Sequence, residues 1–442
     1  MHPRLRTRRP ARGFALIALL AILMTGALYF IVERLDAAAV LRKRDEATTL
    51  ALARAKEALI AFAASANLTS GSSRPGDLPC PDRTNDGKAE TSCGNSAGSH
   101  PERRLGRLPW QTLGVDDLRD GYGEHLWYAV SNNFKNNTRT LPLNSDTVGT
   151  ITVRDANGNV EFDGTGVNGV VAVIIAPGYP LTRQDGVVQN RIAANTNDPT
   201  HYLDNIASED NASFNDGSLD GFFSGPVFDP ADPAVTIAND RVVAITQSEI
   251  MAAIEKRVAA EVMNCLVGYA AANGGRYPWA ADLAATAAGN FSDSANTLFG
   301  RVPNLMCNTG GDGHTPPCDL LPVGTVPGGM LTTWGSVPNC FVTNNWFSQN
   351  YWNEQVFYSL ASAYKPRIGP PPSCGTCLSV DGTGSKQVVV MVAGKAIGAQ
   401  TRANKADPAQ YLETPNSTGG TNYATKSATP PFNDRVRYFP TP

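Results

Sequence analysis

An oxygen-rich turn is the first place in the sequence whose residue types suit metal chemistry. Asp82, Asn85 and Asp86 fall within one short stretch that closes on Gly87. Carboxylate and amide oxygens in such turns are the ligands that Ca²⁺ prefers. The spacing is not that of an EF-hand loop, and Asx-rich turns also bond their own backbone. The sequence therefore leaves two readings, a calcium site at these three residues or a self-bonded turn, and it predicts no other cofactor.

The cysteines form an even set, 8 in number, which suits a framework of oxidised pairs. Two pairs each bracket an Asp-Gly turn, and a third has C-x-x-C spacing. The C-x-x-C spacing also serves zinc and redox centres, but here it follows a proline run and precedes a β-rich segment instead of opening a helix. We therefore expect structural disulfides at all three places. The candidate pairs are Cys80 with Cys93, Cys307 with Cys318, and Cys374 with Cys377.

The remaining sequence contains no constellation that selects an enzyme mechanism. The 5 histidines are scattered without metal-binding spacing, and no nucleophile elbow, phosphate loop or zincin motif is present. The net charge is -3, and no basic stripe interleaved with aromatic residues runs through the chain. Nucleic-acid binding needs such a basic surface. We predict a protein that is not an enzyme and does not bind nucleic acid.

The N-terminal segment has the pattern of a membrane anchor. Residues 14–32 form an uncharged apolar run, about as long as the ~20 residues that a helix needs to cross a bilayer. Arginines precede this run, so the positive-inside rule leaves residues 1–13 in the cytoplasm and exports the rest. A cleaved secretory signal ending near Ala39 is the alternative.

The helical pattern continues beyond the apolar run. Residues 33–67 are rich in Ala, Leu, Lys, Arg and Glu, with Leu52, Leu59 and Phe62 at near-helical spacing. This pattern predicts one long helix with a transmembrane half and an amphipathic half. Two separate helices, an anchor and a stalk, are the other reading.

Arg12, Gly13 and Phe14, followed by the long apolar run, resemble the N-terminal signal of type IV prepilins and type II secretion pseudopilins. The resemblance implies that a prepilin peptidase cuts after Gly13 and methylates the new terminus at Phe14. It also implies that the helix packs on other pilin or pseudopilin subunits. Members of the family usually carry Glu at the fifth mature position, where this chain has Ala18. Tip subunits lack that Glu, so the departure favours a minor or tip-like subunit, or else a chain that does not enter a filament.

Downstream of the helix, a series of short landmarks occurs twice in the same order, which predicts two copies of one unit. A second helix, from about 249 to 273, begins with a capping box formed by Thr246 and Glu249. In each copy a helix is followed by Pro-rich loops and then by β-rich runs. The paired landmarks include Ala58–Ala64 with Cys265–Ala271, Gly106–Pro109 with Gly300–Pro303, Val170–Ala176 with Val388–Ala393, and Asn239–Val242 with Asn433–Val436.

We therefore expect an α+β fold in which a long N-terminal helix packs on an antiparallel sheet and a second, tandem pilin-like unit follows. The expected parts are a leader (1–13), a transmembrane helix (14–32), a first unit (33–245, with its helix to about 67) and a second unit (246–442). The protein would be a single-pass protein of the bacterial inner membrane, with its N-terminus cytoplasmic and its head periplasmic or extracellular.

The function expected from this pattern is that of a non-enzymatic, pseudopilin-like or minor-pilin-like subunit of a type IV pilus or a type II secretion-like machine. Its work would be assembly or binding. Its expected partners are other pilin subunits, prepilin peptidase and the membrane. The alternative is a signal-anchored periplasmic enzyme, or a carbohydrate-binding or adhesin protein.

Overall fold

The computed structural model describes residues 14–65, 74–94, 100–136, 142–214, 221–294, 296–303, 334, 337, 340, 346–366, 371, 373–375, 377–426 and 431–440. Within the first helix it describes the side chains at 19, 20, 22–24 and from 38 onward. The predicted leader with Gly13, the side chain of Phe14, and both Cys307 and Cys318 lie outside the described residues.

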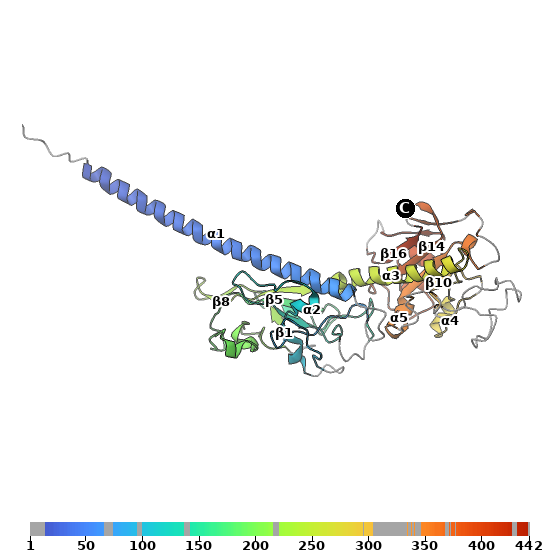
Figure 1. The fold of residues 1–442 in the computed structure, drawn as a ribbon, viewed down its shortest axis with the longest axis horizontal. Coiled ribbons are helices and arrows are strands. Elements are labelled where there is room, and N and C mark those ends of the chain that lie inside the picture. Colours follow the sequence, from blue (N-terminus) through green and yellow to red (C-terminus); the bar gives the residue numbers. More distant parts are fainter. Residues whose placement is uncertain are drawn as a thin grey trace, which may run out of the picture.

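A single helix, α1 (Phe14–Ala64), opens the fold and contains 51 residues. At ~1.5 Å per residue it is about 75 Å long. Its buried side chains begin at Thr48 and recur every three or four residues, so they lie on one face of the helix. That face packs on β5 (Ala172–Ala176). Before Thr48 no described side chain of the helix is buried, although Arg44 and Asp45 still contact Tyr122 and Arg241. Further toward its N-terminus the helix extends away from the rest of the molecule (Figure 1). We call residues 14–47 the stem and the remainder the head.

Two four-stranded antiparallel sheets form the centre of the head, and their topologies are the same. The first sheet has the order β1-β2-β5-β9, and the second has the order β10-β11-β14-β16. The strands of the first are β1 (Leu105–Arg107), β2 (Trp127–Val130), β5 and β9 (Arg241–Ile245). The strands of the second are β10 (Phe299–Arg301), β11 (Val356–Leu360), β14 (Val388–Val392) and β16 (Arg435–Phe439).

Smaller sheets repeat this correspondence. Two three-stranded sheets have the orders β4-β3-β6 and β13-β12-β15. In each, the central strand is antiparallel to the first strand of that order and parallel to the last. The bounds are β3 (Val153–Arg154), β4 (Val160–Phe162), β6 (Phe222–Phe223), β12 (Leu378–Val380), β13 (Thr383–Lys386) and β15 (Asn422–Tyr423). A hairpin of β7 (Val227–Phe228) and β8 (Thr236–Ala238) adds to the first unit.

The second long helix, α3 (Gln247–Ala272), directly follows β9 and begins where the sequence predicts. Thr246 is its N-cap, and the capping box with Glu249 is present. One side of α3 packs on β14 and β16 and another contacts α1, so the helix belongs to the cores of both halves of the head. The shorter helices are α2 (Trp110–Leu113), α4 (Leu283–Ala287), α5 (Trp346–Gln349) and α6 (Trp352–Gln355).

The fold class is therefore α+β with antiparallel sheets, as predicted. The division at 245/246 stays a prediction; it falls between the last residue of β9 and the cap of α3. We keep the terms first unit (33–245) and second unit (246–442). In the part of the chain that the structure describes, no helix is long and apolar enough to cross a membrane. The transmembrane helix over 14–32 stays a prediction.

Candidate functional site

The stem exposes apolar side chains. Leu19, Leu20, Leu23 and Met24 are between 58% and 63% exposed, and at about 100° of turn per residue they fall within an arc of about 140° on one side of the helix. The uncharged run 14–32 carries apolar residues on the other sides as well, and a helix that is apolar on all sides is typical of a membrane span or of the centre of a helical assembly. The predicted processing site adjoins this surface, since α1 begins at Phe14.

The Asp82 turn bonds its own backbone. Asp82 is 1% exposed, and its Oδ1 and Oδ2 atoms accept the backbone N–H groups of Asn85 and Gly87, each at 2.7 Å. Asp86 accepts the N–H of Lys88 at 2.9 Å. Among the described residues, no group of three or more His, Cys, Asp or Glu side chains is arranged to hold a metal. This geometry favours the self-bonded turn, and the calcium site stays a prediction.

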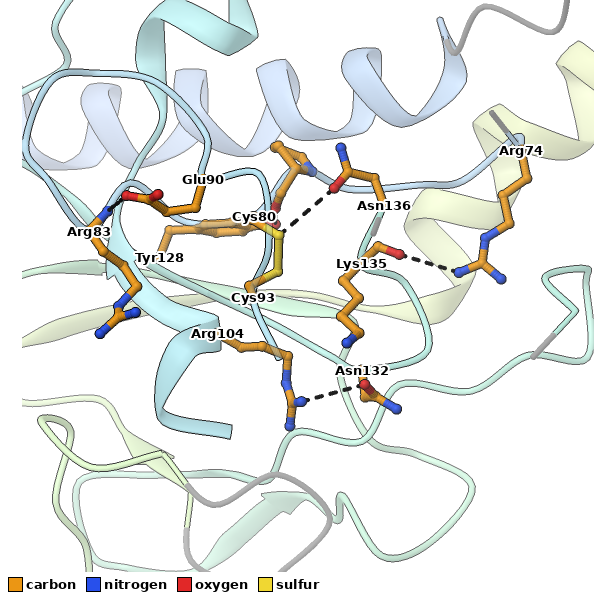
Figure 2. The surroundings of a disulfide bond; sticks show 11 residues. Arg74, Cys80, Arg83, Glu90, Cys93, Arg104, Tyr128, Asn132, Lys135 and Asn136 are labelled. Atoms are coloured by element: carbon orange, nitrogen blue, oxygen red, sulfur yellow. Dashed lines mark hydrogen bonds between the residues drawn. A yellow bond between two sulfur atoms is a disulfide. The ribbon is translucent and has the colours of Figure 1, made fainter. Parts of the chain in front are cut away.

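A disulfide holds this turn against the sheet. Cys80 and Cys93 are joined, as predicted, and both are buried. Tyr128 of β2 donates its hydroxyl hydrogen to the carbonyl oxygen of Pro79 at 3.1 Å, next to Cys80 (Figure 2). The backbone N–H of Arg83 donates to the Glu90 carboxylate at 3.2 Å (Figure 2). The loop between the two cysteines is therefore fixed at both ends.

The other disulfides lie in the second unit. Cys374 and Cys377 are joined, so the C-x-x-C motif forms a disulfide as expected. Cys265 of α3 is joined to Cys340, a pairing that the sequence analysis did not predict. Nothing in the spacing of these two residues marks them as partners, because the bond closes a loop with a sequence separation of 75.

A pocket of about 390 Å³ lies beside the Asp82 turn in the first unit. Its lining includes the buried Arg107 of β1, Trp127 of β2 and Phe214. Arg83 and Thr200 also line it and are more exposed, and we call them its rim. Trp127 and Phe214 pack in the core on the sheet face away from α1, because the α1 face is covered by a separate cluster containing Leu59.

The Arg107 guanidinium lies between two aromatic rings. Its central carbon is 4.8 Å from the Trp127 ring centre and 4.5 Å from the Tyr202 ring centre. Its Nη2 atom donates to the carbonyl oxygen of Thr196 at 2.7 Å, whereas Nε and Nη1 have no hydrogen-bond partner among the described residues. Burial lowers the pKa of Arg107, and Tyr202 opposes this effect.

Each unit also places two carboxyl groups near the start of its last strand. Asp240 accepts the backbone N–H of Asp204 at 2.7 Å, and both side chains are buried. Asp434 is also buried and accepts the backbone N–H of Glu413 at 3.1 Å, whereas Glu413 is half-buried. Burial raises the pKa of both Asp240 and Asp434 well above its usual range, and the neighbouring carboxyl group raises it further. These hydrogen bonds hold a loop onto the sheet in each unit.

A short segment of the first unit binds the second unit. Asp146 accepts hydrogen bonds from Gln355 Nε2 at 2.7 Å, from the backbone N–H of Ala396 at 2.9 Å and from Arg402 Nε at 3.1 Å. On the helices, Lys56 of α1 forms an ion pair with Glu249 of α3 at 2.7 Å. The two units are therefore joined by directed polar contacts as well as by the shared core.

No family model, no curated protein and no solved structure matches this chain. Its function must therefore be argued from its own residues.

Proposed function

We propose that this chain is a membrane-anchored subunit of the pilin and pseudopilin class, acting in assembly or binding and not in catalysis. The main observation behind the proposal is that α1 has two parts, the stem and a C-terminal half that packs on the head. From Thr48 onward the helix buries one face in the head, whereas the described apolar side chains of the stem are exposed. This is the arrangement that a subunit needs if its helix joins a bilayer or a bundle of similar helices.

The composition of the stem supports the same proposal. The apolar run 14–32 is followed by charged residues between Glu33 and Glu46. The stem spans about 50 Å, of which a membrane helix needs ~30 Å. The remaining ~20 Å would place the charged segment among lipid headgroups and keep the head clear of the bilayer.

The disulfides of the head support export. Oxidised pairs persist in the periplasm and outside the cell, whereas the cytoplasm keeps thiols reduced. The pairs Cys80–Cys93, Cys265–Cys340 and Cys374–Cys377 occur in both units. Both units therefore suit the same oxidising compartment.

The experiment that tests the proposal is the determination of the mature N-terminus by mass spectrometry, with and without a co-expressed prepilin peptidase. We expect a chain that begins at N-methylated Phe14 when the peptidase is present. The variant Gly13→Val should remain uncut, whereas the neighbouring variant Ala11→Val should be processed normally.

Two outcomes would overturn the proposal. An intact Met1 in the presence of active peptidase would leave an anchored exported protein outside the pilin class. A terminus near Ala39 would mean that a secretory signal had been removed and that the stem is absent from the mature protein.

A further inference from the structure

The strands that surround the pocket of the first unit have counterparts in the second, where an aromatic side chain lies at the matching position. β1 and β10 align as Leu105 with Phe299 and Arg107 with Arg301, because each pairs in the same way with the next strand. Phe299 stacks on Phe357 with ring centres 6.1 Å apart. A Cβ atom at Gly419 would lie 2.8 Å from the Phe299 ring, so this ring fills the space tightly.

The lining also changes from polar in the first unit to apolar in the second. Asp82 and Ala281 occupy the same place, because each forms an antiparallel bridge with the aligned arginine of the edge strand. Thr200 corresponds to Ala409, since each follows an Asp-Pro pair that begins a short 3-10 helix. Packing alone would not require polar residues around the open space, because the second unit fills it with apolar ones.

The two aligned arginines differ in their hydrogen bonds. In the second unit Arg301 Nη2 donates to the carbonyl oxygen of Lys405 at 3.0 Å, and Nη1 donates to the carbonyl oxygen of Glu354. In the first unit only the Nη2 bond is kept, and Nη1 of Arg107 has no partner among the described residues. Arg107 is 3% exposed, so this donor is shielded from bulk water.

The charges around the pocket are largely neutralised by protein groups. The Asp82 carboxylate accepts backbone N–H groups, and Asp210 pairs with Arg183 at 2.9 Å. The other charged side chains of the lining are the acidic Glu102 and the basic Arg83 and Arg107. The two positive charges of these arginines balance the negative charges of Asp82 and Glu102, so the site offers donors and acceptors without a net charge to attract an ion.

We propose that this pocket binds a neutral sugar residue, such as the terminal unit of a glycan. Hydroxyl groups both donate and accept, which suits a rim of carboxylate, guanidinium and hydroxyl groups around Thr200. The apolar part of the lining, to which Leu105, Ala212 and Phe214 contribute, suits the C–H groups of a pyranose ring. The volume of about 390 Å³ falls in the ~300–1,000 Å³ range of small-molecule sites. This inference goes beyond the proposed membrane-anchored role and does not depend on cleavage after Gly13.

The test is ligand-observed NMR with the full chain in detergent and a set of methyl glycosides of glucose, galactose, mannose and N-acetylglucosamine. We expect at least one glycoside to bind. Leu105→Phe, which copies Phe299, should weaken that binding by at least about tenfold by occupying the space the sugar needs. The rim variant Arg83→Ala should also weaken it, and it alters an exposed side chain that the fold does not need.

The matched control is Arg437→Ala, which removes an exposed arginine of β16 in the second unit and should leave the affinity unchanged. The proposal is overturned if no glycoside binds to the folded full chain. It is equally overturned if both Leu105→Phe and Arg83→Ala bind the glycoside with unchanged affinity.

Discussion

The first and second units share a scaffold but differ in what they attach to it. Both have the same strand order, an arginine held between aromatic rings, and a buried aspartate just before the last strand. The first unit carries the stem and an open polar pocket, whereas the second has the long-range disulfide and fills the matching space with Phe299. The difference indicates that the residues shared by the two units serve packing. The features found in one unit alone come from residues around this shared scaffold.

The disulfides should produce the largest difference between the units. Cys265–Cys340 closes a loop with a sequence separation of 75, against 13 for Cys80–Cys93. Loop-closure entropy then gives about 4.5 kcal/mol for the long loop and about 3 kcal/mol for the short one. We expect the double variant Cys265→Ser/Cys340→Ser to lose more unfolding free energy than Cys80→Ser/Cys93→Ser in urea titrations of the purified chain. The opposite order would show that the native-state contacts of the short loop outweigh chain entropy.

Two leucines at matching positions test whether α1 and α3 are buried in the head to the same extent. Leu59 of α1 and Leu266 of α3 hold the same place in the aligned helices, and both are 0% exposed. Truncating either to Ala should cost about 3 kcal/mol, because it removes a buried side chain and leaves a cavity. Leu50→Ala is the control, since Leu50 is 53% exposed and a surface change costs less than ~0.5 kcal/mol. Equal losses for Leu50 and Leu59 would contradict the assignment of the buried face of α1.

We expect the second unit to make a pH-dependent contribution to the free energy of unfolding. Thr48 of α1 and Glu255 of α3 align, and both are buried. Burial raises the pKa of Glu255 to about 7, against the lowering effect of Arg435, while Asp146 raises it further. The native state therefore keeps a proton that the unfolded chain has lost, and stability falls as pH rises from about 4.5 to about 7.

The shift for Glu255 corresponds to about 3 kcal/mol across that window. The variant Glu255→Gln, which is neutral at every pH, should flatten the decline in unfolding free energy measured by urea titration between pH 4.5 and 7. Thr48→Val should leave the pH dependence as it is in the parent chain. A decline that survives in Glu255→Gln would assign the effect to other buried acids, such as Asp240 or Asp434.

The smallest expected effect concerns the contact between the units. Asp146→Ala removes the acceptor for Gln355, Ala396 and Arg402, which should cost about 2 kcal/mol because charged hydrogen bonds are lost. We expect the units to unfold in two steps in calorimetry once this contact is gone, whereas the exposed control Asp116→Ala should keep the parent profile. A single unchanged transition in Asp146→Ala would mean that the shared core alone couples the units.

Local patterns predicted the parts of this molecule that depend on neighbours in the sequence. The capping box at Thr246, the pairing of Cys80 with Cys93 and the recurring strands all follow from short-range chemistry or from repetition. The Cys265–Cys340 bond and the Asp146 contact were missed, because both join residues far apart in the chain. The pocket was not predicted for a different reason, because whether a space is open depends on the size of the side chains around it. The clue in the sequence was that Leu105 aligns with the larger Phe299.

The packed half of α1 determines how the molecule responds to tension. The helix lies along its own sheet and also contacts α3, so it joins the stem directly to both units. A pull along the stem would load the contacts of Leu52, Leu59 and Ala63 together, as a shear, instead of opening them one after another. Forced unfolding is governed by the height of the unfolding barrier and not by equilibrium stability. A force that acts through the N-terminal helix would therefore meet several buried contacts at once.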